Sequence, residues 1–159
     1  MLLQDIFPVS RIKTDLEAED KEEVFEELVD LLVSDRTIGA DRDEILAAIR
    51  EREEKMSTGI KNGIALPHGK TGAVRGIGGA LGISRRGIDY DALDGEPVHL
   101  VVLLVSSKDD SERHLTTLKK MALLLENREF YQSMIGAEDP EKAFQILRSH
   151  ENLLGYQDR

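Results

Sequence analysis

The stretch Ser57-Thr-Gly-Ile-Lys-Asn-Gly-Ile-Ala-Leu-Pro-His-Gly69 decides how the middle of this chain folds. Its apolar segment, residues 64–66, is typical of a short strand, and Pro67 follows at once. Because proline has no N–H to donate, we expect strand pairing to end there, with His68 held at the mouth of a sheet. Gly69 has no side chain, so we expect a second molecule to be able to approach the His68 imidazole closely. An accessible imidazole on a rigid element is nucleophilic and suited to carrying a group covalently.

The composition predicts one domain inside the cell. The 159 residues are enough for a single substantial core, which we place from about residue 3 to about residue 150 of a domain spanning 1–159. The absence of cysteine excludes disulfides and fits a reducing cytosol. The longest apolar run, residues 98–105, is too short to span a bilayer, and the N-terminus lacks the pattern of a signal peptide. We therefore expect a cytoplasmic protein that does not insert into a membrane.

The charge of the chain excludes general nucleic-acid binding. The net charge is −10, whereas phosphate backbones require clustered Lys and Arg, and the 4% aromatic content leaves little for base stacking. The acidity is concentrated in residues 15–30, which hold nine Asp or Glu and a single Lys. We interpret this run as a solvated helix face; the alternatives are a docking surface for a basic partner or adaptation to a salty cytoplasm.

Hydrophobic periodicity predicts an α/β architecture. Two capping pairs, Asp20 with Glu23 and Asp41 with Glu44, open helices over about 20–34 and 41–55, and Gly39 breaks the chain between them. Strands are expected at 64–66, 77–84 and 98–105, with turns at 85–87 and 93–97. Three helices follow, at about 110–126, 128–135 and 139–149. We therefore expect a single domain with a central mixed β-sheet flanked by helices on both faces.

The helix after the last strand carries a second candidate histidine. Residues 98–105 are almost continuously apolar, as expected of a central strand that is covered on both faces. The helix that follows is expected to bury one face, formed by Leu115, Leu118, Met121, Ala122 and Leu125. His114 falls in its first turn, where free N–H groups bind anions and disfavour a protonated imidazole. We expect a neutral His114 that can donate one N–H; the alternative is a capping or buried, hydrogen-bonded histidine.

Helical spacing also singles out one arginine before the central stretch. Residues four, three and four apart share one helix face, and here they are Ile45, Ile49, Arg52 and Met56. Arg52 therefore continues the buried stripe, while Arg50 turns to solvent. An inward guanidinium needs an anion, and a phosphoryl group matches its planar fork. The alternative is that Arg52 favours the dipole at the helix C-terminus or pairs with a nearby Glu.

Other chemistries lack their patterns. No His-x-x-x-His or Glu-x-x-His spacing supports a metal site, and no Gly-x-Ser-x-Gly motif supports hydrolysis. No glycine-rich nucleotide loop with a following lysine is present, so ATP is not the expected donor. We predict no metal and no cofactor. His99 is interpreted as a satisfied histidine of the apolar strand, and His150 as part of an unpatterned C-terminal tail.

The opening stretch resembles the signature of enzyme IIA domains of the fructose/mannitol class of the bacterial phosphotransferase system, including the stand-alone nitrogen-regulatory branch. The similarity continues through Gly87-Ile-Asp-Tyr-Asp-Ala-Leu-Asp-Gly-Glu-Pro-Val98 and His114-Leu-Thr-Thr-Leu118. The resemblance implies that His68 takes a phosphoryl group from the small histidine phosphocarrier, with Arg52 beside it and His114 supporting it. Thr58 is a candidate phosphate-binding residue in the adjoining loop. Lys61 departs from the family, which usually has glycine there; a cation near His68 would strengthen phosphoryl binding or obstruct the partner.

Two functions follow from this resemblance. In the first, the chain is a phosphotransferase-type carrier with a phosphohistidine intermediate, and it passes the group to a cysteine or histidine of a sugar-permease domain. In the second, it is a regulatory binding module, in which phosphorylation of His68 switches the affinity for a target protein. A chain without a fused carrier or membrane domain favours the regulatory branch, although separate sugar-specific IIA chains also exist.

Overall fold

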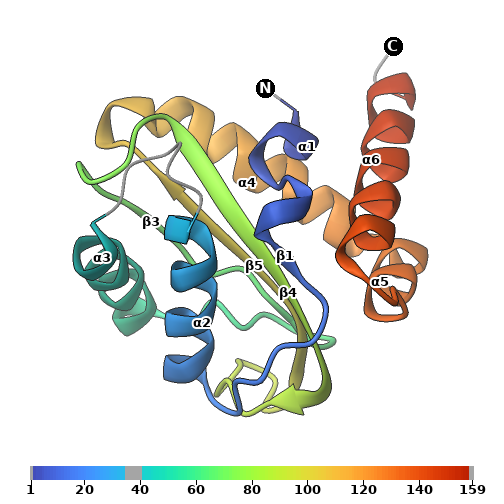
Figure 1. Ribbon diagram of the computed structural model, residues 1–159, viewed down its shortest axis with the longest axis horizontal. Helices are drawn as coiled ribbons and strands as arrows, with labels where there is room; N and C mark the ends of the chain where they lie inside the picture. The colour runs from blue at the N-terminus through green and yellow to red at the C-terminus, as the bar shows by residue number, and fades with distance from the viewer. Residues whose placement is uncertain (1, 35–40, 158–159) are drawn as a thin grey trace.

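The computed structural model describes residues 2–34 and 41–157, and it shows one β-sheet between two layers of helices (Figure 1). The strands are β1 (Ile12–Lys13), β2 (Ile64–Ala65), β3 (His68–Lys70), β4 (Ile77–Ile88) and β5 (Val98–Ser106). Their order is β1-β4-β5-β2, and β3 also pairs with β5. β4 and β5 run antiparallel, whereas the other pairs are parallel. The predicted mixed sheet of an α/β domain is confirmed.

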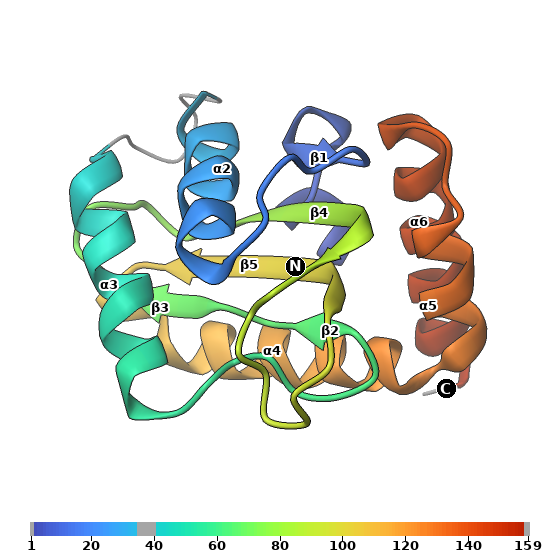
Figure 2. The same ribbon diagram turned by 90° about the horizontal axis from the view of Figure 1, so that it is seen from below.

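Helices cover both faces of this sheet, as expected. They are α1 (Leu3–Ile6), α2 (Lys21–Ser34), α3 (Arg42–Lys55), α4 (Ser111–Glu126), α5 (Arg128–Ile135) and α6 (Pro140–Gln157), with short 3-10 turns η1 (Val9–Arg11) and η3 (Lys108–Asp110). α2 and α3 pack on one face, and α1, α4, α5 and α6 pack on the other (Figures 1 and 2). Among the described residues, no helix is long and apolar enough to cross a bilayer.

β5 joins the two hydrophobic cores. Its side chains alternate between the faces of the sheet, because successive residues of a strand point in opposite directions. Leu100, Val102 and Leu104 belong to the core under α4, α5 and α6. Val101, Leu103 and Val105 belong to the core under α2 and α3. The prediction of a central strand buried on both faces is therefore confirmed.

Both long N-terminal helices begin where their capping pairs predict. The Asp20 carboxylate accepts the N–H of Glu23 at 2.9 Å, and the Asp41 carboxylate accepts the N–H of Glu44 at 3.1 Å. The Glu23 carboxylate accepts the N–H of Glu19, which lies one residue before the capping aspartate. The expected break at Gly39 lies outside the described residues.

Strand pairing does not end at Pro67, contrary to the sequence-based expectation. β3 begins with the next residue, and His68 pairs in parallel register with Leu104 of β5. The Pro67 carbonyl accepts the N–H of Leu104 at 3.0 Å. Proline therefore removes one donor from the pairing with β5, but it does not end that pairing. His68 is therefore the first residue of a short strand that pairs with β5, and it is half-buried.

The turn predicted at residues 85–87 is a bulge inside a strand. β4 continues to Ile88, and its register with β5 shifts between Ile83 and Ile88. Gly87 has φ +92°, and its N–H donates to the Ser84 hydroxyl at 3.0 Å. The turn predicted at 93–97 is confirmed, with Gly95 at φ +74° donating its N–H to the Ala92 carbonyl.

Two predictions about the C-terminal helices are wrong in part. The buried side of α4 is formed by His114, Thr117, Met121, Leu124 and Leu125, whereas Leu115 is 53% exposed. Met121 and Leu125 are buried and Leu118 packs against the core, as predicted. Leucines occur on both sides of this helix, so periodicity alone wrongly included Leu115. α6 extends to Gln157, eight residues beyond the expected end at 149. His150 consequently lies within a helix, and its ring packs 5.2 Å from that of Phe130.

A buried carboxylate should make a large contribution to stability. Glu151 of α6 is 2% exposed, accepts the N–H groups of Leu3 and Gln4, and pairs with Lys120 at 2.6 Å. We expect Glu151→Ala to lower the free energy of unfolding by about 3 kcal/mol, because it leaves these donors without their acceptor. Urea unfolding measures the loss. Gln145→Ala, at an exposed position of the same helix, should change stability little, and a similar loss in both variants would contradict the assignment.

Candidate functional site

α3 and β3 lie side by side at one end of the sheet (Figure 2). A cleft of about 790 Å³ opens between these two elements and the start of α4. Three predicted site residues line it, each from a different element: Arg52 from α3, His68 from β3 and His114 from α4. The fold therefore gathers side chains that are up to 62 positions apart in the sequence. Within the described ranges, no three His, Asp or Glu side chains are grouped as metal ligands would be.

The hydrogen bonding of His68 fixes which ring nitrogen is free. Its Nδ1 lies 2.8 Å from the Leu66 carbonyl oxygen. Because a carbonyl only accepts, Nδ1 carries the hydrogen, and the lone pair of the neutral ring is on Nε2. Burial is the main cause that lowers the His68 pKa, and the positive charges of Arg52 and Lys70 add to it. His68 is therefore held as a neutral imidazole with a nucleophilic Nε2.

Gly69 has a packing role that its sequence position did not suggest. A Cβ on this glycine would lie 3.1 to 3.2 Å from the backbone and Cβ of Ala48 in α3. Gly69 is itself buried. The missing side chain therefore allows β3 and α3 to approach each other, which sets the position of His68 relative to Arg52. Gly69 also lines the cleft beside His68, so the expectation that it leaves room for a second molecule stays a prediction.

His114 is buried beside His68. It is the fourth residue of α4 and 5% exposed, and the centroids of the two imidazole rings are 5.6 Å apart. Its Nδ1 lies 2.5 Å from the hydroxyl oxygen of Ser106, the last residue of β5. Burial lowers the His114 pKa to about 4, with smaller contributions from His68 and Lys70. The ring is thus neutral near pH 7, and burial, more than the helix N-terminus, is the main cause.

Arg52 lies at the cleft and also contacts the C-terminus of its own helix. It is half-buried and lines the cleft, and its Nη1 donates to the Met56 carbonyl at 2.8 Å, at the C-terminus of α3. In the part of the chain that the structure describes, no carboxylate pairs with it. Met56 itself is 60% exposed, so the buried stripe ends before it. Arg50 points away and pairs with Glu22 of α2, as its position off the stripe predicts.

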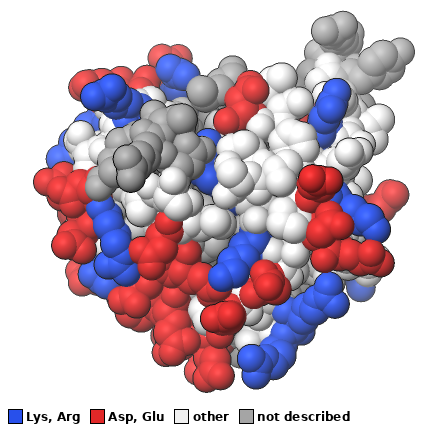
Figure 3. All heavy atoms as spheres, in the orientation of Figure 1, with Lys and Arg blue, Asp and Glu red and all other residues white. Residues whose placement is uncertain are grey.

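Three lysines that sequence reasoning missed also line the cleft: Lys55, Lys70 and Lys108. With Arg52 they provide four cations, against the two carboxylates of Glu44 and Glu51. The chain as a whole is strongly acidic, and acidic side chains gather over α2 (Figure 3). The local excess of positive charge therefore favours an anionic ligand at this cleft. The signal in the sequence was the position of Lys70, two residues after His68 on the same strand.

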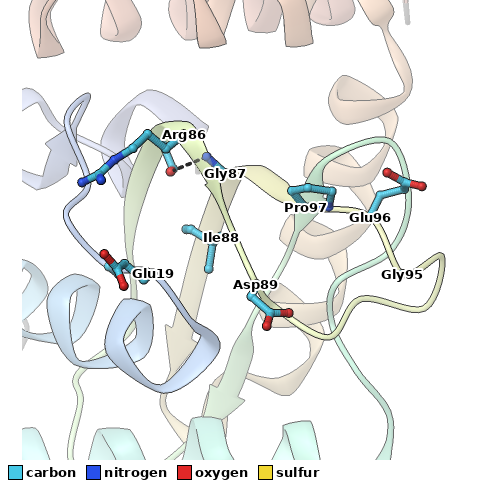
Figure 4. A pocket seen from close by; sticks show the side chains of 10 residues that line it. Glu19, Arg86, Gly87, Ile88, Asp89, Gly95, Glu96 and Pro97 are labelled. Atoms are coloured by element: carbon cyan, nitrogen blue, oxygen red, sulfur yellow. Dashed lines mark hydrogen bonds between the residues drawn. The ribbon is translucent and has the colours of Figure 1, made fainter.

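A second hollow has the opposite charge. It has a volume of about 410 Å³ and lies beside the bulge of β4 (Figure 4). Its charged lining residues are Glu19, Arg86, Asp89 and Glu96, so carboxylates outnumber the single cation three to one. Such a lining disfavours a phosphoryl group, in contrast to the lining of the cleft around His68.

Thr58 does not belong to the cleft. It is 5% exposed, and its hydroxyl contacts the Glu53 carboxylate at 2.5 Å and the Tyr90 hydroxyl at 2.7 Å. Lys21 pairs with the same glutamate at 3.1 Å. These contacts connect α2 and α3 to the loop that follows α3. The geometry contradicts the expectation that Thr58 binds phosphate, because its hydroxyl is buried and already engaged.

Lys61 is also placed away from His68. It lines a separate hollow with Tyr131 of α5 and Glu126, the last residue of α4, whereas His114 lies near the first residue of that helix. A helix of 16 residues spans about 24 Å. The expectation of a cation beside His68 is therefore met by Lys70, and it is wrong for Lys61.

His99 is not among the residues that line the cleft. Its Nδ1 lies 2.9 Å from the Ser84 carbonyl oxygen, as expected for a strand histidine whose hydrogen bonding is satisfied.

The low pKa of His114 gives a testable pH dependence of stability. Below pH 6.5 the unfolded chain binds a proton at this residue, whereas the folded chain stays neutral down to pH about 4. The free energy of unfolding should therefore fall as the pH is lowered from 6.5 towards 4, by roughly 2 to 3 kcal/mol from this residue. We expect His114→Gln to lose less stability than the wild type between pH 7 and pH 4.5 in urea unfolding. Equal losses in the two proteins would contradict a buried, neutral His114.

The sequence and the fold are similar to those of known proteins. Residues 5–150 match the family described as phosphoenolpyruvate-dependent sugar phosphotransferase system, EIIA 2. The fructose-specific EIIABC component of Bacillus subtilis is 34% identical over 95% of this chain, and the chain spans 24% of that relative's length. The fructose-specific EIIA component of Haloferax volcanii is 32% identical, and the alignment covers 91% of this chain and 94% of the relative.

The crystal structure of nitrogen regulatory protein IIA-Ntr from Neisseria meningitidis superimposes with a TM-score of 0.84 at 30% identity. The superposition covers 91% of this chain and 98% of that one. The relatives therefore include both sugar-specific and nitrogen-regulatory proteins, and the resemblance inferred from the sequence is confirmed. This chain belongs to the EIIA 2 family of the phosphoenolpyruvate-dependent sugar phosphotransferase system.

Proposed function

We propose that this chain, as one enzyme IIA domain over residues 1–159, carries a phosphoryl group on Nε2 of His68 and acts in the cytoplasm. The observation that supports this most is the bond from Nδ1 of His68 to the Leu66 carbonyl. It leaves Nε2 with the lone pair, at a cleft where cations outnumber carboxylates. The donor is the small histidine phosphocarrier, which presents its group as a phosphohistidine.

The transfer exchanges one phosphorus–nitrogen bond for another. The Nε2 lone pair of His68 forms a bond to phosphorus while the bond to the donor imidazole breaks, and that electron pair stays on the donor nitrogen. Nδ1 of His68 keeps its hydrogen and its bond to the Leu66 carbonyl throughout. Such a displacement depends on positioning and on stabilisation of the charged oxygens. Arg52 and Lys70 supply positive charge near the ring, and His114 supplies a neutral donor.

The step after phosphorylation has two candidates. The names of the fructose-specific relatives favour onward transfer to a cysteine or histidine of a sugar-permease domain. The overlap with IIA-Ntr favours a regulatory role, in which nearly two added negative charges change the affinity for a target protein. Onward transfer requires a permease partner, because the phosphoryl group must pass to another component of the phosphotransferase system. The regulatory role does not require one.

A reconstituted mixture of phosphoenolpyruvate, enzyme I, the histidine phosphocarrier and this chain tests the carrier function. We expect the chain to gain an acid-labile phosphate that depends on the phosphocarrier. Adding a fructose-permease IIB domain then separates the two candidates, because a transport protein should lose its phosphate to that domain and a regulatory one should retain it. A chain that gains no phosphate would contradict the proposed function.

A further inference from the structure

Ser106 makes a contact that the transfer reaction itself does not explain. It is the last residue of β5 and is 0% exposed, and its hydroxyl oxygen lies 2.5 Å from Nδ1 of His114. The backbone of Ser106 belongs to the sheet, where its carbonyl accepts the N–H of Thr71 at 3.0 Å. A rigid strand end therefore holds the hydroxyl against the histidine ring.

The hydrogen of this hydroxyl has one partner. Among the residues that the structure describes, Nδ1 of His114 is the only group in hydrogen-bond contact with the Ser106 side chain. If His114 carried its hydrogen on Nδ1, the serine hydrogen would be buried without an acceptor, at a cost of about 1 to 3 kcal/mol. The arrangement with both groups satisfied has the serine donating to Nδ1. The single hydrogen of the neutral His114 ring is then on Nε2.

We propose that Ser106 is a positioning residue that holds His114 as the Nε2–H tautomer, so that this ring donates a hydrogen bond to the phosphoryl group carried by His68. This inference rests on the proposed function for its phosphoryl partner. The opposite tautomer would place a lone pair, instead of an N–H, on the nitrogen available to the phosphoryl oxygens. A lone pair repels those anionic oxygens, whereas an N–H attracts them.

Nitrogen-15 NMR of the unphosphorylated protein tests the tautomer directly. In the wild type, the His114 signals should show a protonated Nε2 and an unprotonated Nδ1 at pH 7. In Ser106→Ala we expect a mixture of tautomers or a hydrogen on Nδ1. Ser106→Thr, which retains the hydroxyl, should restore the wild-type pattern. A wild-type His114 with its hydrogen on Nδ1 would overturn the proposal, whether or not the variants fold.

Transfer kinetics supply the second readout. Ser106→Ala should slow phosphoryl transfer from the phosphocarrier by about tenfold, the equivalent of one hydrogen bond of about 1.4 kcal/mol in the transition state. Ser106→Thr should recover most of the rate. The control is Ser107→Ala, whose hydroxyl accepts the N–H of Asp109 and does not contact the cleft histidines, and which should keep the wild-type rate.

The outcomes distinguish this inference from the proposed function. A Ser106→Ala protein with an unchanged tautomer and an unchanged rate would overturn the role of Ser106 alone. A wild-type protein that shows the expected tautomer but takes up no phosphate would overturn the proposed function, and it would reduce the Ser106 contact to a structural one.

Discussion

Replacing His68 with alanine is expected to abolish the acceptance of phosphate from the phosphorylated histidine phosphocarrier. The Nε2 of His68 carries the lone pair that would accept the phosphoryl group. The other cleft histidine, His114, is only 5% exposed and is therefore not expected to replace His68 as the acceptor. The fold should survive, because the half-buried ring makes one hydrogen bond, to the neighbouring Leu66 carbonyl, worth about 1 kcal/mol. Phosphate uptake in the reconstituted mixture measures the loss, with circular dichroism and urea unfolding as checks on the fold.

The matched control for this variant is His99→Gln. His99 is another half-buried histidine of the same sheet, bonded to a backbone carbonyl, and it lies outside the cleft. The His99→Gln protein should accept phosphate at the wild-type rate. A folded His68→Ala protein that still takes up acid-labile phosphate at that rate would show that a different residue is the acceptor.

Arg52→Ala should have the second-largest effect, a slowing of transfer by about a hundredfold or more. Removing one preorganised donor at the reacting group costs this much in other enzymes, because its charge acts where negative charge develops. Arg52 lines the cleft and lowers the His68 pKa by its charge. The expected loss of stability is modest, since the bond to the Met56 carbonyl lies on the outer side of the protein.

Arg50→Ala is the control for Arg52→Ala. The two arginines are on the same helix, two positions apart, but Arg50 pairs with Glu22 of α2 and does not line the cleft. Its removal should leave the transfer rate within about twofold, because exposed ion pairs contribute little. Arg52→Lys should recover part of the rate, since lysine keeps the charge and loses the planar fork. Equal rate losses in Arg52→Ala and Arg50→Ala would contradict the assignment of the α3 face.

The local pattern of the sequence predicted most elements of the fold. The helices after Asp20 and Asp41 begin at their capping residues, because capping is a contact within three residues. β3 could not be predicted in this way. Its pairing with Leu104 and its neighbours depends on a strand more than 30 positions away, and the proline before it signalled an end. The bulge at Gly87 likewise differs from the predicted turn, since glycine is common in both structures.

The site was predicted by residue type and resemblance, and its geometry required the fold. His68, His114 and Arg52 meet in one cleft as expected. Thr58 is close to His68 in the chain, but the loop turns its hydroxyl towards the buried Glu53 carboxylate. Distance along the chain could not show this. Ser106 and the cleft lysines were missed for the same reason, because their relevance comes only from strands and helices that meet in three dimensions.

The position of the phosphate on the phosphorylated protein tests the central claim most directly. Phosphorus-31 and nitrogen-15 NMR of the chain, labelled at histidine and phosphorylated through the phosphocarrier, reports which nitrogen carries the group. We expect one phosphohistidine, on Nε2 of His68, with Nδ1 of the same ring still protonated and bonded to the Leu66 carbonyl. Phosphate on Nδ1 of His68, or on any other residue, would contradict the proposed mechanism.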